Sequence, residues 1–117
     1  PPPLESLDVF SARLTLRSSL YIPLLTTLKS LTLCTGNVTD EFVASISSGC
    51  GSLTSLNISL NRRVTDLSAG AIRDRLERIE VLNLSRTSCT REAVRVLSGS
   101  RSLRVLCVVG CGGCEER

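Results

Sequence analysis

The sequence predicts an α/β fold in which about five copies of one unit stack side by side, with a parallel sheet on one side and helices on the other. A strand-like segment with aliphatic residues at its first, fourth and sixth positions recurs every 24 to 26 residues. The triplet Val-Thr-Asp occurs twice, 26 residues apart, each time before a segment with helical spacing. Aromatic residues make up only 3% of the chain, so the core must be aliphatic, which suits stacked repeats.

The five strand-like segments are residues 4–9, 28–33, 53–58, 79–84 and 103–108. Because side chains alternate across a strand, the first, fourth and sixth positions enter the core, and the third and fifth positions point away from it. The third positions are Ser6, Ser30, Ser55, Val81 and Val105, and the fifth positions are Asp8, Thr32, Asn57, Asn83 and Cys107. The sequence therefore predicts an exposed strip of small, nearly uncharged side chains.

The segments between the strands predict helices of unequal quality. Pro23 breaks the segment before residue 28, so we expect only a short or irregular element there, such as a 3₁₀ turn. Either Thr39 or Asp40 can cap the next helix, and Gly49 is expected to follow its last residue as a helix stop. Its inward face is predicted to consist of Phe42, Val43 and Ile46.

Two further helices are predicted over residues 67–76 and 91–97. In the first of them Leu67, Ala71, Ile72 and Leu76 are expected to face the strands. Ser88 or Thr90 is expected to cap the second, and Gly99 to end it. Residues 112–117 carry no helical pattern.

The chain, residues 1–117, is expected to form a single repeat array that is a piece of a longer protein, with neighbouring repeats or capping segments of the same protein as partners at its ends. It begins with three prolines instead of Met, and it ends soon after the fifth strand-like segment. The net charge of +3 comes from 14 cationic and 11 acidic residues that are interleaved, which favours a solvated face over a nucleic-acid or membrane-binding surface. The chain contains no apolar run near 18 residues.

Six cysteines could form a disulfide framework, but most of them fall on repeat positions, where a buried thiol acts as a small apolar group. A reduced, intracellular chain, cytoplasmic or nuclear, is therefore expected. Cys111 and Cys114 have Cys-x-x-Cys spacing, and Cys107 lies upstream. A structural zinc site needs four ligands and the chain has no His, so we expect no metal, and no cofactor.

The segment from Cys50 to Ile58, followed by Val64-Thr65-Asp66, resembles the leucine-rich repeat family, closest to its cysteine-containing and ribonuclease-inhibitor-like classes. The resemblance implies a curved, right-handed solenoid with a concave parallel sheet and convex helices. It also implies a ladder position in each turn that satisfies backbone groups. That position reads Ala12, Gly36, Asn61, Thr87 and Cys111. Ala12 and Gly36 have no side chain for this role, so water or neighbouring turns must replace it.

The function expected is a non-catalytic scaffold that binds a protein partner through the concave face or the strand-to-helix loops. The candidate contact residues are Ser30, Thr32, Ser55, Asn57, Val81 and Asn83 on the strands and Arg62, Arg63 and Arg86 in the loops. The alternatives are a structural subunit within a large assembly and, by resemblance alone, the substrate-recognition arm of a ubiquitin ligase, although the chain shows no F-box. Without His or paired carboxylates, we expect no enzyme.

Three glycosylation sequons begin at Asn37, Asn57 and Asn83. The last two arise from the repeat itself, because a Leu-Asn-Leu-Ser strand contains the sequon. Glycans there would cover the concave face, so we expect the sequons to be incidental.

Overall fold

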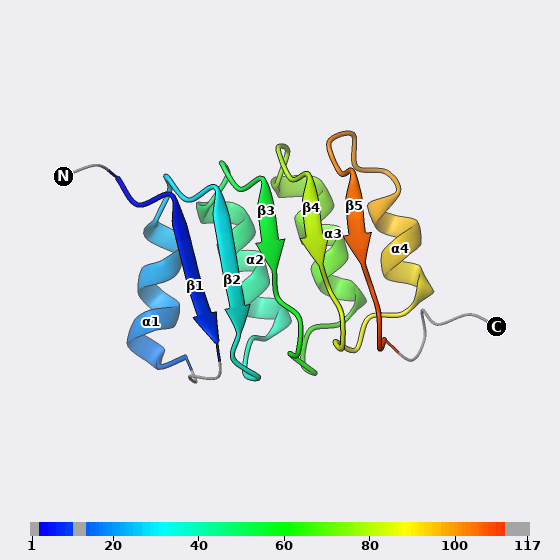
Figure 1. Cartoon of the computed structure of the whole chain (residues 1–117), viewed down its shortest axis with the longest axis horizontal. Coiled ribbons are helices and arrows are strands. Elements are labelled where there is room, and N and C mark those ends of the chain that lie inside the picture. The colour runs from blue at the N-terminus through cyan, green and yellow to red at the C-terminus, as the bar shows by residue number, and fades with distance from the viewer. Residues whose placement is uncertain (1–2, 11–13, 112–117) are drawn as a thin grey trace.

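A computed structural model describes residues 3–10 and 14–111. In that part of the chain the elements form one parallel sheet with the helices stacked on one of its faces (Figure 1). The strands, adjacent in chain order, are β1 (Ser6–Phe10), β2 (Ser30–Cys34), β3 (Ser55–Asn57), β4 (Val81–Asn83) and β5 (Val105–Cys107). The helices are α1 (Leu16–Tyr21), the 3₁₀ helix η1 (Ile22–Leu24), α2 (Asp40–Gly49), α3 (Asp66–Arg75) and α4 (Arg91–Leu97). The predicted α/β class with a single parallel sheet is confirmed.

The register of the sheet confirms the predicted alignment of repeat positions. Each strand pairs with the next at equivalent positions, so the third-position residues form one row across the sheet and the fifth-position residues form another. The fourth-position row is Leu7, Leu31, Leu56, Leu82 and Leu106. Because the repeats have nearly equal lengths, every strand reaches the sheet with the same residues facing inward.

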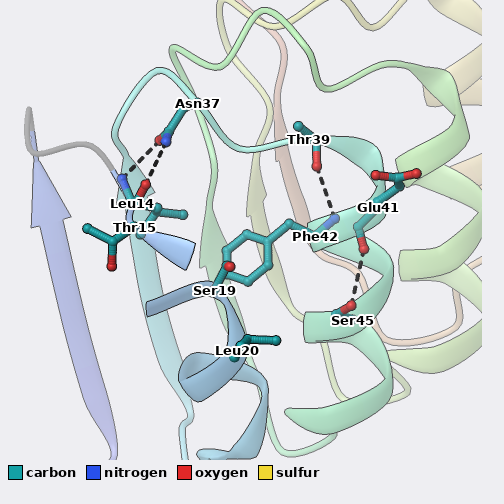
Figure 2. A pocket seen from close by; sticks show the side chains of 9 residues that line it. All are labelled: Leu14, Thr15, Ser19, Leu20, Asn37, Thr39, Glu41, Phe42 and Ser45. Carbon is teal, nitrogen blue, oxygen red and sulfur yellow. Dashed lines mark hydrogen bonds between the residues drawn. The ribbon is translucent and has the colours of Figure 1, made fainter. Parts of the chain in front are cut away.

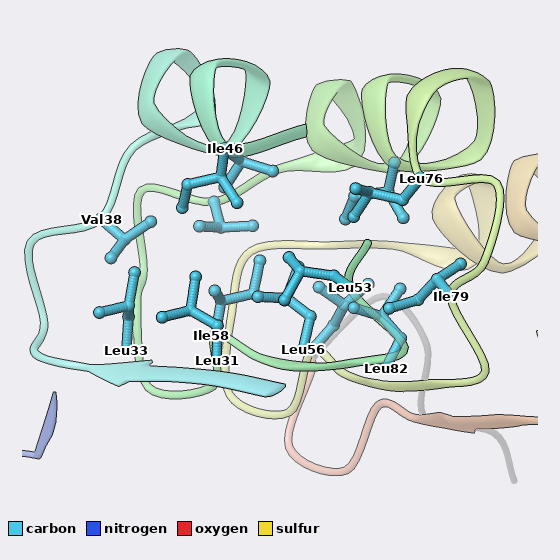
Figure 3. Packing of buried hydrophobic residues seen from close by; sticks show 14 of the residues in the cluster. Leu31, Leu33, Val38, Ile46, Leu53, Leu56, Ile58, Leu76, Ile79 and Leu82 are labelled. Atoms are coloured by element: carbon cyan, nitrogen blue, oxygen red, sulfur yellow. The ribbon is translucent and has the colours of Figure 1, made fainter. Parts of the chain in front are cut away.

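The core lies between the sheet and the helices and is almost entirely aliphatic (Figure 3). Leu31, Leu56 and Leu82 extend from the central strands and are at most 1% exposed. Ile46 and Leu76 approach them from the helix layer and are equally buried. Burial of aliphatic side chains in such a layer is the main favourable contribution to folding.

A threonine caps the N-terminus of every α-helix among the described residues. The side-chain oxygens of Thr15, Thr39, Thr65 and Thr90 each accept a hydrogen bond from a backbone N–H in the first turn. The alternative caps Asp40 and Ser88 are therefore wrong, since Asp40 is the first residue of α2. The first helix is short and leads into a 3₁₀ turn containing Pro23, as predicted.

The inward face of α3 differs from the prediction. Leu67 is 77% exposed, whereas Ser68, Ala69 and Ile72 are buried. Helix α3 presents Ser68 to the neighbouring repeat, where its hydroxyl donates to the carboxylate of Asp40 at 2.6 Å. The prediction failed because it considered only apolar residues for the inward face, and this hydrogen bond allows a serine to be buried there.

The predicted Gly49 stop also needs correction. Gly49 is the last residue of α2, and Cys50 is the cap that follows it. The predicted lack of helix in residues 112–117 and the ladder position Ala12 lie outside the described residues. None of the helices within 3–10 and 14–111 has the length and apolar composition needed to cross a bilayer.

Candidate partner-binding surface

The six strand residues predicted to contact a partner lie together on the sheet face opposite the helices, here called the open face. Ser30, Ser55 and Val81 occupy neighbouring strands in one row. Thr32, Asn57 and Asn83 form the adjacent row. Val81 is 40% exposed, and the other five side chains are half-buried. The open face is therefore a shallow polar surface with an aliphatic contribution towards β5.

Two asparagines of the open face also shape the chain. The Oδ1 atom of Asn57 accepts from the N–H of Ser59 at 3.0 Å, and that of Asn83 accepts from the N–H of Ser85 at 2.9 Å. These bonds turn the backbone where the strand ends. Asn57 and Asn83 are thus local turn residues as well as candidate contact residues.

The three loop arginines lie where β3 and β4 lead towards their helices, and all three are exposed. The Nη1 atom of Arg62 donates to the carbonyl of Thr87 at 3.4 Å, which links the two loops. The side chain of Arg86 lies over Gly110, because a Cβ built at Gly110 would be 2.8 Å from the Cγ of Arg86. The structure thus brings Arg62 and Arg86 to neighbouring turns at one edge of the open face, whereas the backbone of Arg63 forms a bridge with Thr39, the cap residue of α2.

The carboxylates closest to these arginines in sequence are engaged elsewhere. Asp66 accepts hydrogen bonds from the N–H and hydroxyl of Thr90, and Glu92 forms an ion pair with Arg95 at 2.7 Å. Among the described residues no carboxylate forms an ion pair with Arg62, Arg63 or Arg86. Within the described part of the chain, these three guanidinium groups therefore carry their positive charge outside any ion pair.

Asn61, next to Arg62 in the chain, forms hydrogen bonds with the backbone of two neighbouring turns. It is fully buried, and its Oδ1 atom accepts from the N–H groups of Gly36 and Val38 at 2.9 and 3.0 Å. Its Nδ2 atom donates to the carbonyls of Leu33, Ile58 and Ser59. Asn61 of the neighbouring turn thus accepts the hydrogen bond of the Gly36 N–H, as predicted for a ladder position without a side chain.

Cys111 occupies the same place in the fifth repeat. Its thiol donates to the carbonyl of Leu84 at 3.0 Å, which matches the bond from Asn61 to Leu33. Thr87 fills the position between them and donates to the same carbonyl at 2.7 Å. The ladder position therefore holds a buried hydrogen-bonding side chain in the third, fourth and fifth repeats. Asn61 and Cys111 bond to the preceding repeat, whereas the bond from Thr87 to Leu84 stays within its own repeat.

Sequence reasoning missed a second ladder that runs along the helix N-termini. The carboxylate of Asp40 accepts from the N–H and hydroxyl of Thr65, at 2.8 and 2.7 Å, and from the hydroxyl of Ser68. Asp66 accepts from Thr90 in the same way. The caps of α3 and α4 are thus tied to the preceding repeat, and the repeated Val-Thr-Asp triplet was the available signal.

We expect Asp40→Ala to lower the free energy of unfolding by about 2 kcal/mol, because it removes three hydrogen bonds to a charged acceptor. Urea denaturation measures the change. Asp74→Ala is the control, since Asp74 is exposed and pairs only with its neighbour Arg73, so its loss should cost less than about 0.5 kcal/mol. Equal effects of the two substitutions would contradict a stabilising role for the Asp40 contacts.

The cysteines within the described residues carry no disulfide. Burial raises the pKa of the Cys50 thiol above its usual value, which keeps it protonated and unreactive. No group of three or more potential metal ligands occurs among residues 3–10 and 14–111. Cys114 lies outside the described residues, so the Cys111–Cys114 pair stays untested.

The sequon asparagine Asn37 joins two repeats. Its Oδ1 atom accepts from the N–H of Leu14 at 3.1 Å, and its Nδ2 atom donates to the carbonyl of the same residue at 3.0 Å. Since a glycan would be attached at Nδ2, modification would disturb this contact. Asn57 and Asn83 use their amide oxygens in the turns described above.

A hollow of about 340 Å³ lies between α1 and α2 (Figure 2). Asn37 and its bonds to Leu14 lie on one side, and Phe42 and Leu20 contribute apolar walls. Thr39 accepts from the N–H of Phe42 at 3.2 Å as the helix cap. The hollow is open to solvent. We interpret it as a gap in helix packing, because α1 is short and leaves part of α2 without a neighbouring helix.

The fold and the surface together define an α/β protein with one parallel sheet, an uncovered polar face and a basic edge. Comparisons of the sequence with protein-family models and with curated proteins found no match. The interpretation of this chain therefore depends on its own residues and their geometry.

Proposed function

We propose that the chain is a leucine-rich repeat solenoid that serves as a non-catalytic scaffold for binding another protein. The observation that carries this proposal is the register of the sheet, in which equivalent positions of five repeats align in rows. A stack of this kind buries one face of every strand and leaves the other face uncovered over the whole sheet. The buried ladder through Asn61, Thr87 and Cys111 supports the same assignment.

The open face and its basic edge are the surface we propose for the partner. A stable protein interface covers about 800 Å² on each partner. The molecule measures 49 × 30 × 18 Å, so the sheet side is large enough. Small side chains such as Ser30 and Ser55 allow close approach, while Arg62 and Arg86 supply charge at the margin. Binding should therefore weaken as salt is added.

A second function, permanent packing within a larger assembly, is favoured by one observation near β5. Val94, Leu97, Leu103 and Leu106 line an open hollow of about 220 Å³, and Val94 is 37% exposed. A neighbouring subunit would bury this apolar surface. A purified chain that stays monomeric and melts cooperatively favours the first function, whereas aggregation that a co-expressed partner prevents favours the second.

The open-face proposal is tested by adding the same bulky charge to either side of the molecule. Ser55→Arg is placed in the centre of the open face, where no hydrogen bond of the Ser55 side chain is lost, and Ala44→Arg is placed on the exposed side of α2. We expect proteins captured by the wild type to bind Ala44→Arg equally well and Ser55→Arg at least about tenfold more weakly.

Affinity capture with quantitative mass spectrometry identifies the partners, and titration calorimetry then gives their affinities. Thermal melting of the three proteins verifies that each is folded. Capture that Ala44→Arg abolishes and Ser55→Arg leaves unchanged would place the binding surface on the helices and refute the proposal.

A further inference from the structure

Two loop residues beside the open face adopt an unfavourable backbone conformation. Leu60 has φ 68° and Arg86 has φ 59°, both in the left-handed region that L residues avoid. The equivalent position of the fifth repeat is Gly110, with φ 81°. The turn therefore accepts glycine, which adopts this conformation without steric cost, yet the third and fourth repeats carry a large side chain.

Burial does not explain these side chains. Leu60 is 51% exposed, and Arg86 is also exposed. Glycine would relieve the backbone strain at both positions. The presence of a large, exposed side chain at each of them therefore supports a hypothesis of function. Leu60 and Arg86 lie side by side, because the N–H of Leu60 donates to the carbonyl of Ser85 at 3.0 Å.

Exposed aliphatic side chains also lie on β4, on β5 and in the turn that follows β5. The N–H of Arg86 donates to the carbonyl of Val109 at 2.9 Å, and Val109 is 68% exposed. Val81 and Val105 are register partners on β4 and β5 and are 40% and 47% exposed. Val105 and Val109 belong to the same repeat: Val105 begins β5, and Val109 lies in the turn that follows this strand.

We define the β3–β5 patch as Leu60, Arg62, Val81, Arg86, Val105 and Val109. It combines four exposed aliphatic side chains with two arginines that form no ion pair among the residues described. Exposed aliphatic groups of this kind favour a partner that buries them. Guanidinium groups that form no ion pair favour carboxylates, which they bind through two parallel hydrogen bonds, and Arg62 keeps further N–H groups for this beside its long bond to Thr87.

We propose that the β3–β5 patch binds an acidic segment of a partner protein, in which carboxylates flank an aliphatic or aromatic side chain. This inference rests on the proposed scaffold function and adds the chemistry of the partner. The apolar residue of the segment packs against Val81, Val105 and Val109, while its carboxylates pair with Arg62 and Arg86. A nucleic acid fits less well, because two arginines neutralise few phosphates and the patch has no aromatic side chain for base stacking.

Replacement with glycine at the strained positions separates binding from folding. Arg86→Gly and Leu60→Gly remove the side chain and also relieve the backbone, so the melting temperature should stay equal to that of the wild type or rise. Arg78→Ser removes one exposed positive charge from the loop between α3 and β4 and is the matched control.

The probe is a phage-displayed library of random peptides, selected on the immobilised wild-type chain. We expect enrichment of peptides that contain Asp or Glu beside Leu, Ile or Phe. Synthetic copies, measured by fluorescence polarisation, should bind the wild type and Arg78→Ser alike, and Arg86→Gly and Leu60→Gly at least about tenfold more weakly.

Enrichment of neutral or basic peptides, or of none, would overturn the proposed partner chemistry. The proposal would also be overturned if acidic peptides bound Arg86→Gly as tightly as the wild type, or if a labelled single-stranded RNA bound the patch in their place. A melting temperature lowered by Arg86→Gly or Leu60→Gly would show that these side chains stabilise the fold, which contradicts the premise of the proposal. In each of these cases a partner whose capture depends on Ser55 would still support the scaffold function, so the two failures are distinguishable.

Discussion

Replacing Asn61 with alanine is expected to lower the free energy of unfolding by about 3 to 5 kcal/mol, because it leaves several buried backbone groups without partners. Asn61 has no exposed surface and bonds to two N–H groups and three carbonyls. Both contacts that its Oδ1 atom accepts reach the turn of the preceding repeat, and one contact that its Nδ2 atom donates reaches Leu33 in the strand of that repeat. The loss should therefore loosen the junction between the second and third repeats, with Gly36 and Val38 exchanging their amide hydrogens faster.

Urea denaturation measures the stability, and amide hydrogen exchange locates the loss. Asn83→Ala is the control, since this half-buried residue caps only the N–H of Ser85 and its removal should cost about 1 kcal/mol. If Asn61→Ala cost no more than Asn83→Ala, the ladder would not hold the repeats together.

Gly49→Ala should be similarly damaging for a steric reason, with an expected loss of about 2 to 4 kcal/mol or failure to fold. A Cβ at Gly49 would lie 1.9 Å from the carbonyl oxygen of Pro23, so the backbone of η1 or α2 would have to move. Both segments are backbone structure within adjacent repeats, and neither can yield by a side-chain rotation.

Gly70→Ala provides a control of opposite sign. Gly70 lies inside α3, and a Cβ there would meet no atom within 4 Å. Alanine has the higher helix propensity, so this variant should gain about 0.5 to 1 kcal/mol. Thermal or urea unfolding of both variants tests the pair, and a Gly49→Ala protein as stable as the wild type would exclude the close contact with Pro23.

The strands were the most predictable part of this fold, since the spacing of the leucines marked their positions and their alternating faces. The rows that contain Ser55 and Asn57 were predicted correctly because repeats of similar length place equivalent residues side by side. The helix faces were less predictable. Leu67 was expected inside and Ser68 was not considered, because hydrophobic spacing carries no information about a hydrogen-bonding partner in the next repeat.

The candidate surface was predicted in the same uneven way. The open-face residues and the loop arginines were found from the repeat, but the positive φ of Leu60 and Arg86 was not, because neither residue type signals such a conformation. The role of Asp40 was also assigned incorrectly. A Thr-Asp pair before a helix suits two different caps, and only the position of Thr65 in the neighbouring repeat shows which contacts the carboxylate makes.

The sequence by itself determined the α/β class, the strand positions, the order of the rows and the aliphatic nature of the core, since these follow from local periodicity. The tertiary structure alone decided which polar groups meet across the repeats: Asn61 with Gly36, Asp40 with Thr65, and Gly49 with Pro23. These contacts join residues more than 20 positions apart, and their distances depend on how closely two turns of backbone pack, which periodicity does not encode.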